Sequence, residues 1–387
     1  MSRILFVAWD GAGNLLSTLG IAKRLAQRGH DVRVLGHRSI QERCGDHGWR
    51  FRAFEHTADF DATVPWAVEA EMTVLAEQLW FNSSVARDVA DELEREPTDV
   101  LIVDCMLWTA LSAGEASGLP TVAMFTTPFA GFRGGPMVEM LAPAIPRLNA
   151  IRAELGLAPV EQLCDVHDAC ALSLVASPQE FEPPIPMPAN VAFVGPVLDG
   201  PALSTTIDEV DIPDGDEPLV VVSMSTSYQG QHDLLQGVVD ALGTLPVHAV
   251  VTTGPAIDPT TIRAHDNTAV VQFASHHELI EQASLVITHA GLGTVVTALS
   301  HGVPLLCLPM GRDQFYNAGT VAALGAGLVL GPESDADVIA EATLVALQDT
   351  NLREGAGRIA ALLSAYGGGV EAVAEIERVA RVEVAVS

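Results

Sequence analysis

The strongest constraint on the fold is a strand, a helix and a second strand that follow one another within residues 3–36. Residues 3–9, RILFVAW, form an unbroken apolar run, which is typical of a strand buried on both faces. After a glycine-containing loop, residues 15–28 place apolar side chains on one helical face, and Gly29 ends this helix. Residues 31–36, DVRVLG, predict the next strand. Such a unit indicates a parallel sheet with its connecting helix packed on one face.

The same alternation continues along the chain and predicts an α/β protein with two doubly wound, Rossmann-like domains facing each other across a cleft. Further buried strands are expected at residues 99–104, 121–125, 172–176, 191–194, 219–223, 247–252, 269–273, 285–288 and 303–308. An acidic stretch rich in Pro and Gly separates the two series and indicates a linker. The predicted organisation is a first domain over 1–200, a linker over 201–218, a second domain over 219–369 and a C-terminal helix over 370–387 that packs back at the domain junction.

Charge and composition exclude several classes of function. The chain of 387 residues carries 20 basic and 49 acidic residues, a net charge of −29, which disfavours binding to nucleic acid or to a membrane surface. No apolar run is long enough to span a membrane, and the N-terminal run is too short for a signal peptide. Five cysteines without CxxC spacing are typical of reduced thiols. We expect a cytoplasmic protein.

Residues 288–317, THAGLGTVVTALSHGVPLLCLPMGRDQFYN, contain the most informative pattern. A strand ends at Thr288, and a glycine-rich turn over 289–294 leads into a helix expected at 295–300. Small residues at a helix start let backbone N–H groups approach a ligand, a geometry that holds a diphosphate without a metal ion. Taken alone, the turn equally suits a tight strand–helix connection. Asp313 and Gln314, after the next strand, could bind sugar hydroxyls or simply cap a helix.

This block resembles the C-terminal signature of the family 1 glycosyltransferases with the GT-B fold, especially the actinobacterial enzymes that decorate antibiotics and other natural products. The resemblance extends over essentially the whole chain and includes RGHDV after the first helix and VVSMSTSYQGQ at the start of the second domain. It implies a metal-independent transferase that uses a nucleotide sugar as co-substrate and binds no further cofactor. The implied donor-binding residues are His289, Gly291, Gly293 and Thr294 for the pyrophosphate, Asp313 and Gln314 for the sugar, Phe273 and Ala274 beside the base, and Ser225 and Thr226 near the phosphates.

One departure from the family bears on the donor. Enzymes of this family that use UDP-sugars often carry a Glu eight residues after the histidine, where it binds both ribose hydroxyls, and this chain has Thr297 there. The change favours a dTDP-sugar over a UDP-sugar. The alternative is that the ribose is held by other residues.

A second departure concerns the catalytic base. In many relatives a His or an Asp follows the last glycine of the first loop, and a second Asp orients it. Here Asn14 occupies the base position, while Asp104 matches the orienting residue. Three alternatives stay open. Asp10 or Asp104 could be the base, with Asn14 positioning the acceptor; the nucleophile could be acidic or nitrogenous enough to need little help; or the chain could be inactive. Asp10 equally suits a helix-capping role.

The resemblance implies an inverting transfer of a sugar, expected to be a deoxy sugar, to an apolar small-molecule acceptor. Residues 57–80 could line the acceptor pocket or form an ordinary amphipathic helix. No metal site is expected, because the DxD triplets at 59–61, 214–216 and 335–337 read as solvated charge. A nucleotide-sugar epimerase of the same fold and a non-catalytic sugar-nucleotide-binding partner are the competing functions. A homodimer is compatible with the sequence.

Overall fold

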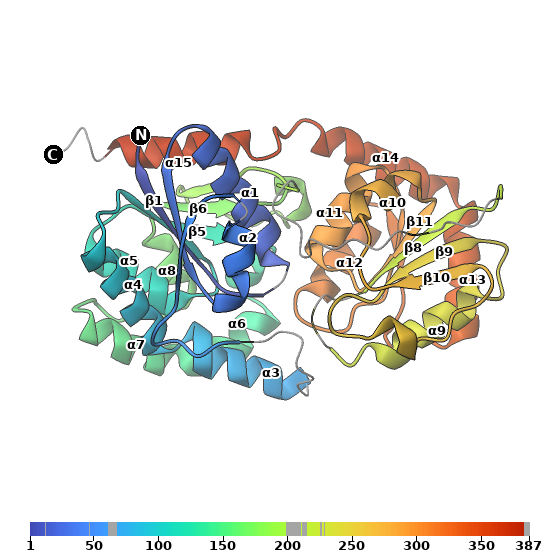
Figure 1. The fold of residues 1–387 in the computed structure, drawn as a ribbon, viewed down its shortest axis with the longest axis horizontal. Helices are drawn as coiled ribbons and strands as arrows, with labels where there is room; N and C mark the ends of the chain where they lie inside the picture. Colours follow the sequence, from blue (N-terminus) through green and yellow to red (C-terminus); the bar gives the residue numbers. More distant parts are fainter. Residues whose placement is uncertain are drawn as a thin grey trace. The chain divides into compact units, whose positions relative to one another are not determined.

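The structure, a computed structural model, describes residues 1–382 except 12, 46, 61–67, 199–209, 211–214, 225, 226 and 228. These residues divide into two compact units (Figure 1). The first unit comprises the described residues within 1–61, 69–203 and 366–382, and the second comprises those within 204–365 together with Val68. Among the described helices, none is long and apolar enough to cross a membrane.

The first unit is built on a seven-stranded parallel sheet. Its strands run in the order β3-β2-β1-β4-β5-β6-β7. Their bounds are Arg3–Ala8 for β1, Asp31–Gly36 for β2, Arg50–Ala53 for β3, Val100–Asp104 for β4, Thr121–Phe125 for β5, Leu172–Val175 for β6 and Val191–Phe193 for β7. The central strand β1 pairs with both β2 and β4, so the order of the strands reverses between β1 and β4.

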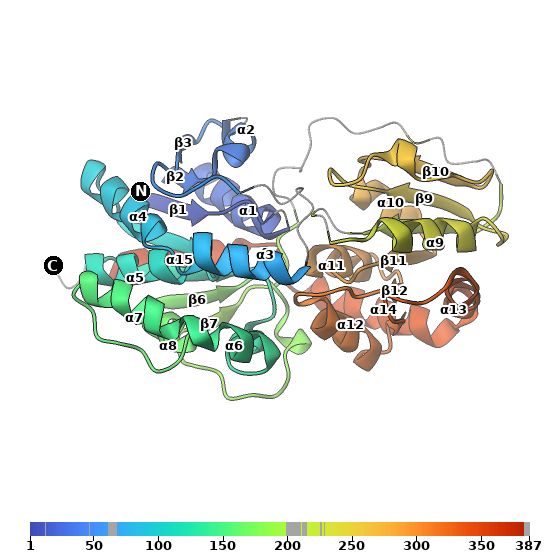
Figure 2. The same cartoon turned by 90° about the horizontal axis from the view of Figure 1, so that it is seen from below.

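Alternate residues of these strands enter two separate cores, because successive side chains of a strand point to opposite faces. Ile4 and Phe6 pack with α1 (Asn14–Gln27) and α15 (Val370–Val382). Leu5 and Val7 pack against the other layer of helices. That layer includes α4 (Ser83–Arg95), α5 (Trp108–Ser117) and α7 (Ile145–Glu154). Figure 2 shows the same arrangement of helices about this sheet. Burial of both faces explains why the strands read as continuous apolar runs.

The second unit repeats the design with a six-stranded parallel sheet in the order β10-β9-β8-β11-β12-β13. Its strands are Leu219–Ser223 for β8, His248–Thr252 for β9, Thr268–Val271 for β10, Leu285–Thr288 for β11, Leu305–Cys307 for β12 and Gly327–Val329 for β13. The helices are α9 (His232–Leu242), α10 (His276–Gln282), α11 (Leu292–Ser300), α12 (Gln314–Ala323), α13 (Ala336–Gln348) and α14 (Thr350–Leu363). The predicted fold class, two doubly wound α/β units, is confirmed.

The C-terminal helix belongs to the first unit, although the residues before it belong to the second. Residues Val373, Ile376 and Val379 of α15 are buried in the core that faces α1. On the outer side, Glu377 accepts hydrogen bonds from Arg28 Nε at 2.7 Å and from Arg28 Nη2 at 2.9 Å. The helix α15 is therefore part of the first core.

Candidate functional site

The predicted donor turn lies at the point in the second sheet where the strand order reverses, between β8 and β11. Open parallel sheets bind ligands outside the carboxyl ends of their strands at such points. The helix predicted at 295–300 begins earlier, at Leu292, with Gly291 as its N-cap residue. Its first helical hydrogen bond runs from Val295 N to Gly291 O at 3.0 Å, and no side chain caps it. The N–H groups of Leu292, Gly293 and Thr294 therefore have no acceptor within the helix.

Backbone strain marks both ends of this signature. Among the described residues, only Ala290 (φ 66°) and Arg312 (φ 55°) are non-glycine residues with positive φ. A side chain in that region costs on the order of 1 kcal/mol, and such residues gather at functional sites. Ala290 directly follows the predicted ligand His289, and Arg312 precedes Asp313. The two strained residues therefore flank predicted donor contacts.

His289 is held as a neutral imidazole. Its side chain is 9% exposed, and burial lowers its pKa to about 4. The positive charges of Arg312 and His276 lower it further, while a hydrogen bond with the backbone of Ser223 acts in the opposite direction. A Cβ atom at Gly291 would lie 2.5 Å from His289 Nε2. Glycine at 291 is therefore needed to let the ring lie beside the start of α11.

The two predicted sugar contacts differ in their freedom to bind. Gln314 is 2% exposed, and its Oε1 accepts from Met310 N at 2.8 Å and from Gly311 N at 3.1 Å. Its Nε2 donates to Gln229 Oε1 at 2.8 Å. Asp313 is half-buried, and its Oδ2 accepts from Asn317 Nδ2 at 3.1 Å. Gln314 thus shapes the turn, whereas Asp313 is the more accessible of the pair.

The remaining predicted donor residues lie at the same edge of the sheet or outside the described residues. Phe273 and Ala274 follow β10 and are half-buried, immediately before α10. Thr297 Oγ1 donates to Gly293 O at 2.8 Å, one turn back along α11. Ser225 and Thr226 lie outside the described residues, so the structure does not place them. Gln229, which holds Gln314, was not predicted, because its role depends on a contact 85 residues away in sequence.

In the first unit the structure brings two of the three predicted catalytic residues into contact. Asn14 begins α1 after β1, and Asp104 ends β4, so both lie where the order of this sheet reverses. Asn14 Nδ2 donates to Asp104 Oδ2 at 2.8 Å, and Met106 N donates to Asp104 Oδ1 at 2.9 Å. Asp104 is 2% exposed, and burial raises its pKa against the lowering effect of these hydrogen bonds.

Asp10 lies apart from this pair, in a separate set of contacts. Its Oδ2 accepts from Ser39 Oγ at 2.6 Å, and its N–H donates to His37 Nδ1 at 3.1 Å. The alternative of Asp10 as a side-chain cap of α1 is wrong, because that helix has Gly13 at its N-cap and no side-chain cap. His37, 1% exposed, was not predicted. Its position after β2, the strand beside β1, is the only sequence signal for it.

The aromatic side chains around Trp9 and His37 pack edge-to-face. Trp9 meets Trp80 at 6.1 Å and Phe60 at 5.9 Å between ring centroids, both edge-to-face. His37 meets Phe54 in the same geometry at 5.3 Å. Trp80 is 3% exposed, so this part of residues 57–80 is core. Phe60, which is half-buried, is the aromatic residue of this cluster that a ligand could touch.

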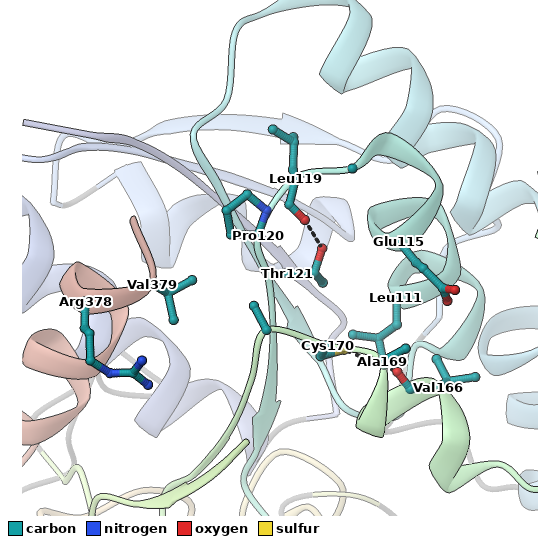
Figure 3. Close-up of a pocket in the computed structure, with 12 residues that line it drawn as sticks. Leu111, Glu115, Leu119, Pro120, Thr121, Val166, Ala169, Cys170, Arg378 and Val379 are labelled. Carbon is teal, nitrogen blue, oxygen red and sulfur yellow. Dashed lines mark hydrogen bonds between the residues drawn. The ribbon is translucent and has the colours of Figure 1, made fainter. Parts of the chain in front are cut away.

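A cavity of about 400 Å³ in the first unit contains none of the predicted site residues. It is lined by Leu111 and Glu115 of α5, by Thr121 at the start of β5, and by Arg378 and Val379 of α15 (Figure 3). Because β5 begins at Thr121, the cavity opens at the amino ends of the strands. The predicted catalytic residues lie at the carboxyl ends, at the opposite edge of the sheet.

The buried histidines predict how stability changes with pH. Burial lowers the pKa of His167 and of His289 from an ordinary 6.5 to about 4. The unfolded chain binds these protons at a pH where the native chain does not, so the free energy of unfolding falls as the pH drops from 6.5 towards 4. We expect a loss of about 1.4 kcal/mol per pH unit for each fully linked histidine.

Urea titrations across this pH range test the prediction, with His167→Gln as the variant that removes one of the two groups. Its unfolding free energy should fall less steeply with decreasing pH than that of the wild type. A stability that does not change between pH 6.5 and 5 would contradict the neutral, buried state of both rings.

Comparisons with known proteins show what the sequence and the fold of this chain are similar to. The family described as "Erythromycin biosynthesis protein CIII-like, C-terminal domain" matches residues 236–378. The 4'-demethylrebeccamycin synthase of Lentzea aerocolonigenes is 26% identical over 422 residues, which cover 97% of this chain and 99% of that protein. The solved glycotransferase of kitacinnamycin has a TM-score of 0.80 at 22% identity, over 98% of this chain and 100% of its own. Glycosyltransferase VinC, solved in complex with dTDP, has a TM-score of 0.76 at 20% identity, over 98% and 99%.

Proposed function

We propose that this chain, which belongs to the family 1 GT-B glycosyltransferases of natural-product biosynthesis, moves a sugar from a dTDP-sugar to an apolar small molecule with inversion. The start of α11 is the observation that supports the use of a nucleotide-sugar donor. Three N–H groups without helical acceptors follow Gly291, beside the neutral ring of His289. A diphosphate that leaves the sugar would accept hydrogen bonds from these N–H groups. The positive end of the helix dipole would stabilise its charge.

Charge balance supports this assignment for the leaving group. Inverting transfer breaks the bond between the anomeric carbon and the diphosphate oxygen, and negative charge grows on the diphosphate. Preorganised backbone donors that stabilise such charge accelerate reactions by about 100-fold to 1,000-fold each. We propose that Gly293 and Thr294 supply such donors, and that Asp313 binds a sugar hydroxyl. We further propose that Phe273 and Ala274 flank the base.

The thymidine form of the donor is supported by Thr297. Its hydroxyl is occupied by Gly293 O at 2.8 Å, so it does not offer the pair of acceptors that a carboxylate would give a ribose. A deoxyribose lacks one of the two hydroxyls, so it loses less binding energy than a ribose where these acceptors are missing. The similarity in fold to a glycosyltransferase solved with dTDP points the same way.

Thr297→Glu is therefore expected to shift the preference from dTDP towards UDP. A hydrogen bond to a charged group contributes about 1.5–3 kcal/mol, so the ratio of the two dissociation constants should change at least about 10-fold. Isothermal titration with both nucleotides measures it. Thr297→Gln, which has similar size and no charge, serves as the control, and an unchanged ratio in Thr297→Glu would contradict the placement of the ribose.

The function is tested by the release of nucleoside diphosphate from a panel of dTDP- and UDP-sugars, with and without acceptors. We expect release that depends on the acceptor and persists in EDTA, because the backbone of α11 takes the place of a metal ion. An epimerase would instead isomerise the sugar without an acceptor. A non-catalytic partner would bind the nucleotide sugar and release nothing from any donor–acceptor pair.

A further inference from the structure

The amide of Asn14 leaves one strong hydrogen-bonding atom unused. Its Nδ2 donates to Asp104 Oδ2 at 2.8 Å and to Trp9 O at 3.2 Å. The Trp9 carbonyl is an acceptor only, so it fixes which end of the amide is nitrogen, and Asp104 accepts from the same end. Asn14 Oδ1 then points away from them; it is buried and has no hydrogen-bond partner among the described residues. A buried acceptor without a partner costs about 1–3 kcal/mol and calls for a ligand or a water molecule.

Glycine at position 11 keeps this oxygen from being covered by the protein itself. A Cβ atom at Gly11 would lie 3.0 Å from Asn14 Oδ1 and 2.8 Å from the Trp9 ring. The atom also lies beside the switch between β1 and β4, where a doubly wound sheet receives its ligand. This oxygen lies at the switch point, has no partner among the described residues and is flanked by a glycine. These three features suit an N–H or O–H group of an acceptor.

The neighbouring carboxylates are poorly placed to take a proton from that group. Asp104 is 2% exposed, and each of its oxygens already accepts an N–H hydrogen bond. Asp10 is turned towards the segment after β2, where it accepts from Ser39 and where its N–H is bound by His37. Asn14 can accept a hydrogen bond but cannot keep a proton. Neither of these two described carboxylates is therefore placed to act as a base for the atom that meets Asn14 Oδ1.

We propose that Asn14 Oδ1 receives an N–H of the acceptor and that the nucleophile is an uncharged, weakly basic amine, such as an aromatic amine. This inference rests on the proposed transferase function and specifies its acceptor. One N–H donates to Asn14 Oδ1 and aims the nitrogen lone pair, and the Asp104 carboxylate on the far side of the amide polarises it. Of the three alternatives given for the base, this proposal selects the one in which the nucleophile is nitrogenous enough to need little help.

The bonds and charges balance without a protein base. The nitrogen lone pair forms the bond to the anomeric carbon, and the electron pair of the carbon–oxygen bond leaves with the nucleoside diphosphate. The nitrogen then carries one positive charge and loses one proton to water, giving an N-glycoside. An alcohol at the same place would form an oxonium, whose proton has to be removed during the attack.

The test uses a panel of bicyclic arenes, each in an amino and a hydroxymethyl form, with the full-length protein and its best donor. The wild type should glycosylate amino forms at least about 10-fold faster than hydroxymethyl forms. Asn14→Ala should lose about 10-fold or more on amines, and Asn14→His, which restores a base, should raise the rate on hydroxymethyl forms. Asp10→Asn tests the alternative base: because a general base contributes about 100-fold or more, a loss of that size on amines would make Asp10 the base and contradict the inference.

Two results would overturn the inference. One is a preference of the wild type for hydroxymethyl acceptors that is abolished in Asp10→Asn, which would make Asp10 the base. The other is a lack of transfer to any amine by a protein that binds dTDP and uses another acceptor. Failure to bind dTDP or UDP at all would instead reject the proposed function, so the two failures are distinguishable. Asn14→Ser, with a smaller change of polarity, replaces Asn14→Ala if the latter does not fold.

Discussion

Gly291→Ala is expected to reduce turnover about 100-fold while leaving the second unit folded, which is the size of effect that a lost oxyanion donor produces. The new Cβ would lie 2.5 Å from His289 Nε2 and 3.0 Å from its Cε1, so the ring has to leave its place beside α11. Gly291 has φ −62° and ψ 136°, a conformation that alanine adopts without strain. The effect is therefore steric and local.

The turnover of the variant is measured together with its dissociation constant for dTDP, which should rise with the loss of His289. Gly237→Ala is the matched control, because it changes a glycine of α9 in the same unit and its Cβ meets nothing within 4 Å. Gly293→Ala adds a sharper comparison. Its Cβ also meets no protein atom within 4 Å, so any loss of affinity there reports the diphosphate itself. Wild-type turnover in Gly291→Ala would contradict the donor site.

Asp104→Ala is the second substitution with a large expected effect, on both stability and catalysis. It leaves Met106 N–H without an acceptor and leaves Asn14 Nδ2 with only Trp9 O at 3.2 Å. A donor left unpaired costs about 1–3 kcal/mol, so the free energy of unfolding should fall by about that amount. A released Asn14 amide no longer aims its oxygen, and a misplacement of this kind costs about 100-fold in rate.

Asp104→Asn separates the two effects, because it keeps the volume of the side chain and one accepting oxygen. We expect a smaller loss of stability than in Asp104→Ala, together with a clear loss of turnover. Urea unfolding and steady-state kinetics measure them, and the affinity for dTDP serves as the internal control, since the donor residues belong to the second unit. Equal turnover in Asp104→Asn and the wild type would show that the charge of Asp104 does not act on Asn14.

The central strands of both sheets could be predicted from the sequence because they are buried on both faces. The strands β1, β8 and β11 contain nearly uninterrupted apolar residues, and their bounds agree with the prediction to within one residue. The edge strands β3 and β13 were missed. β3 reads Arg-Phe-Arg-Ala, and β13 has three residues of which one is buried. Neither segment contains an apolar run long enough to indicate a strand, whereas the edge strands β7 and β10 do and were predicted.

The helix α4 was also missed, although its apolar residues Val85, Val89 and Leu93 recur at a helical spacing. Its buried face includes Asp88 and Glu92, which are 4% and 2% exposed. Glu92 is buried because it pairs with Arg33, from Nη1 to Oε1 at 2.7 Å, and Arg33 lies on the neighbouring strand β2. The helix itself could therefore have been found from its apolar residues, whereas the burial of Glu92 against a partner 59 residues away could not.

The residues of the candidate site also differ in how far the sequence predicts them. The glycine-rich turn into α11 could be predicted because a single segment supplies the glycines, the helix and the histidine, although the helix begins at Leu292 and not at residue 295. The contact between Asn14 and Asp104 joins residues 90 positions apart and followed only from the family resemblance. His37 and Gln229 contact Asp10 and Gln314 through hydrogen bonds between residues far apart in the sequence, and only the position of His37 after a predicted strand is visible locally.

The route of the chain has a consequence for the order of events during synthesis. The first unit is interrupted, and its last helix, α15, is translated after every strand of the second unit. Until Val373, Ile376 and Val379 have left the ribosome, the face of the first sheet that they cover stays open to water. The second unit, which apart from Val68 is encoded between residues 204 and 365, can therefore fold first, contrary to the usual order in which the N-terminal domain folds first. A nascent chain that stalls before residue 370 would expose an apolar surface to chaperones.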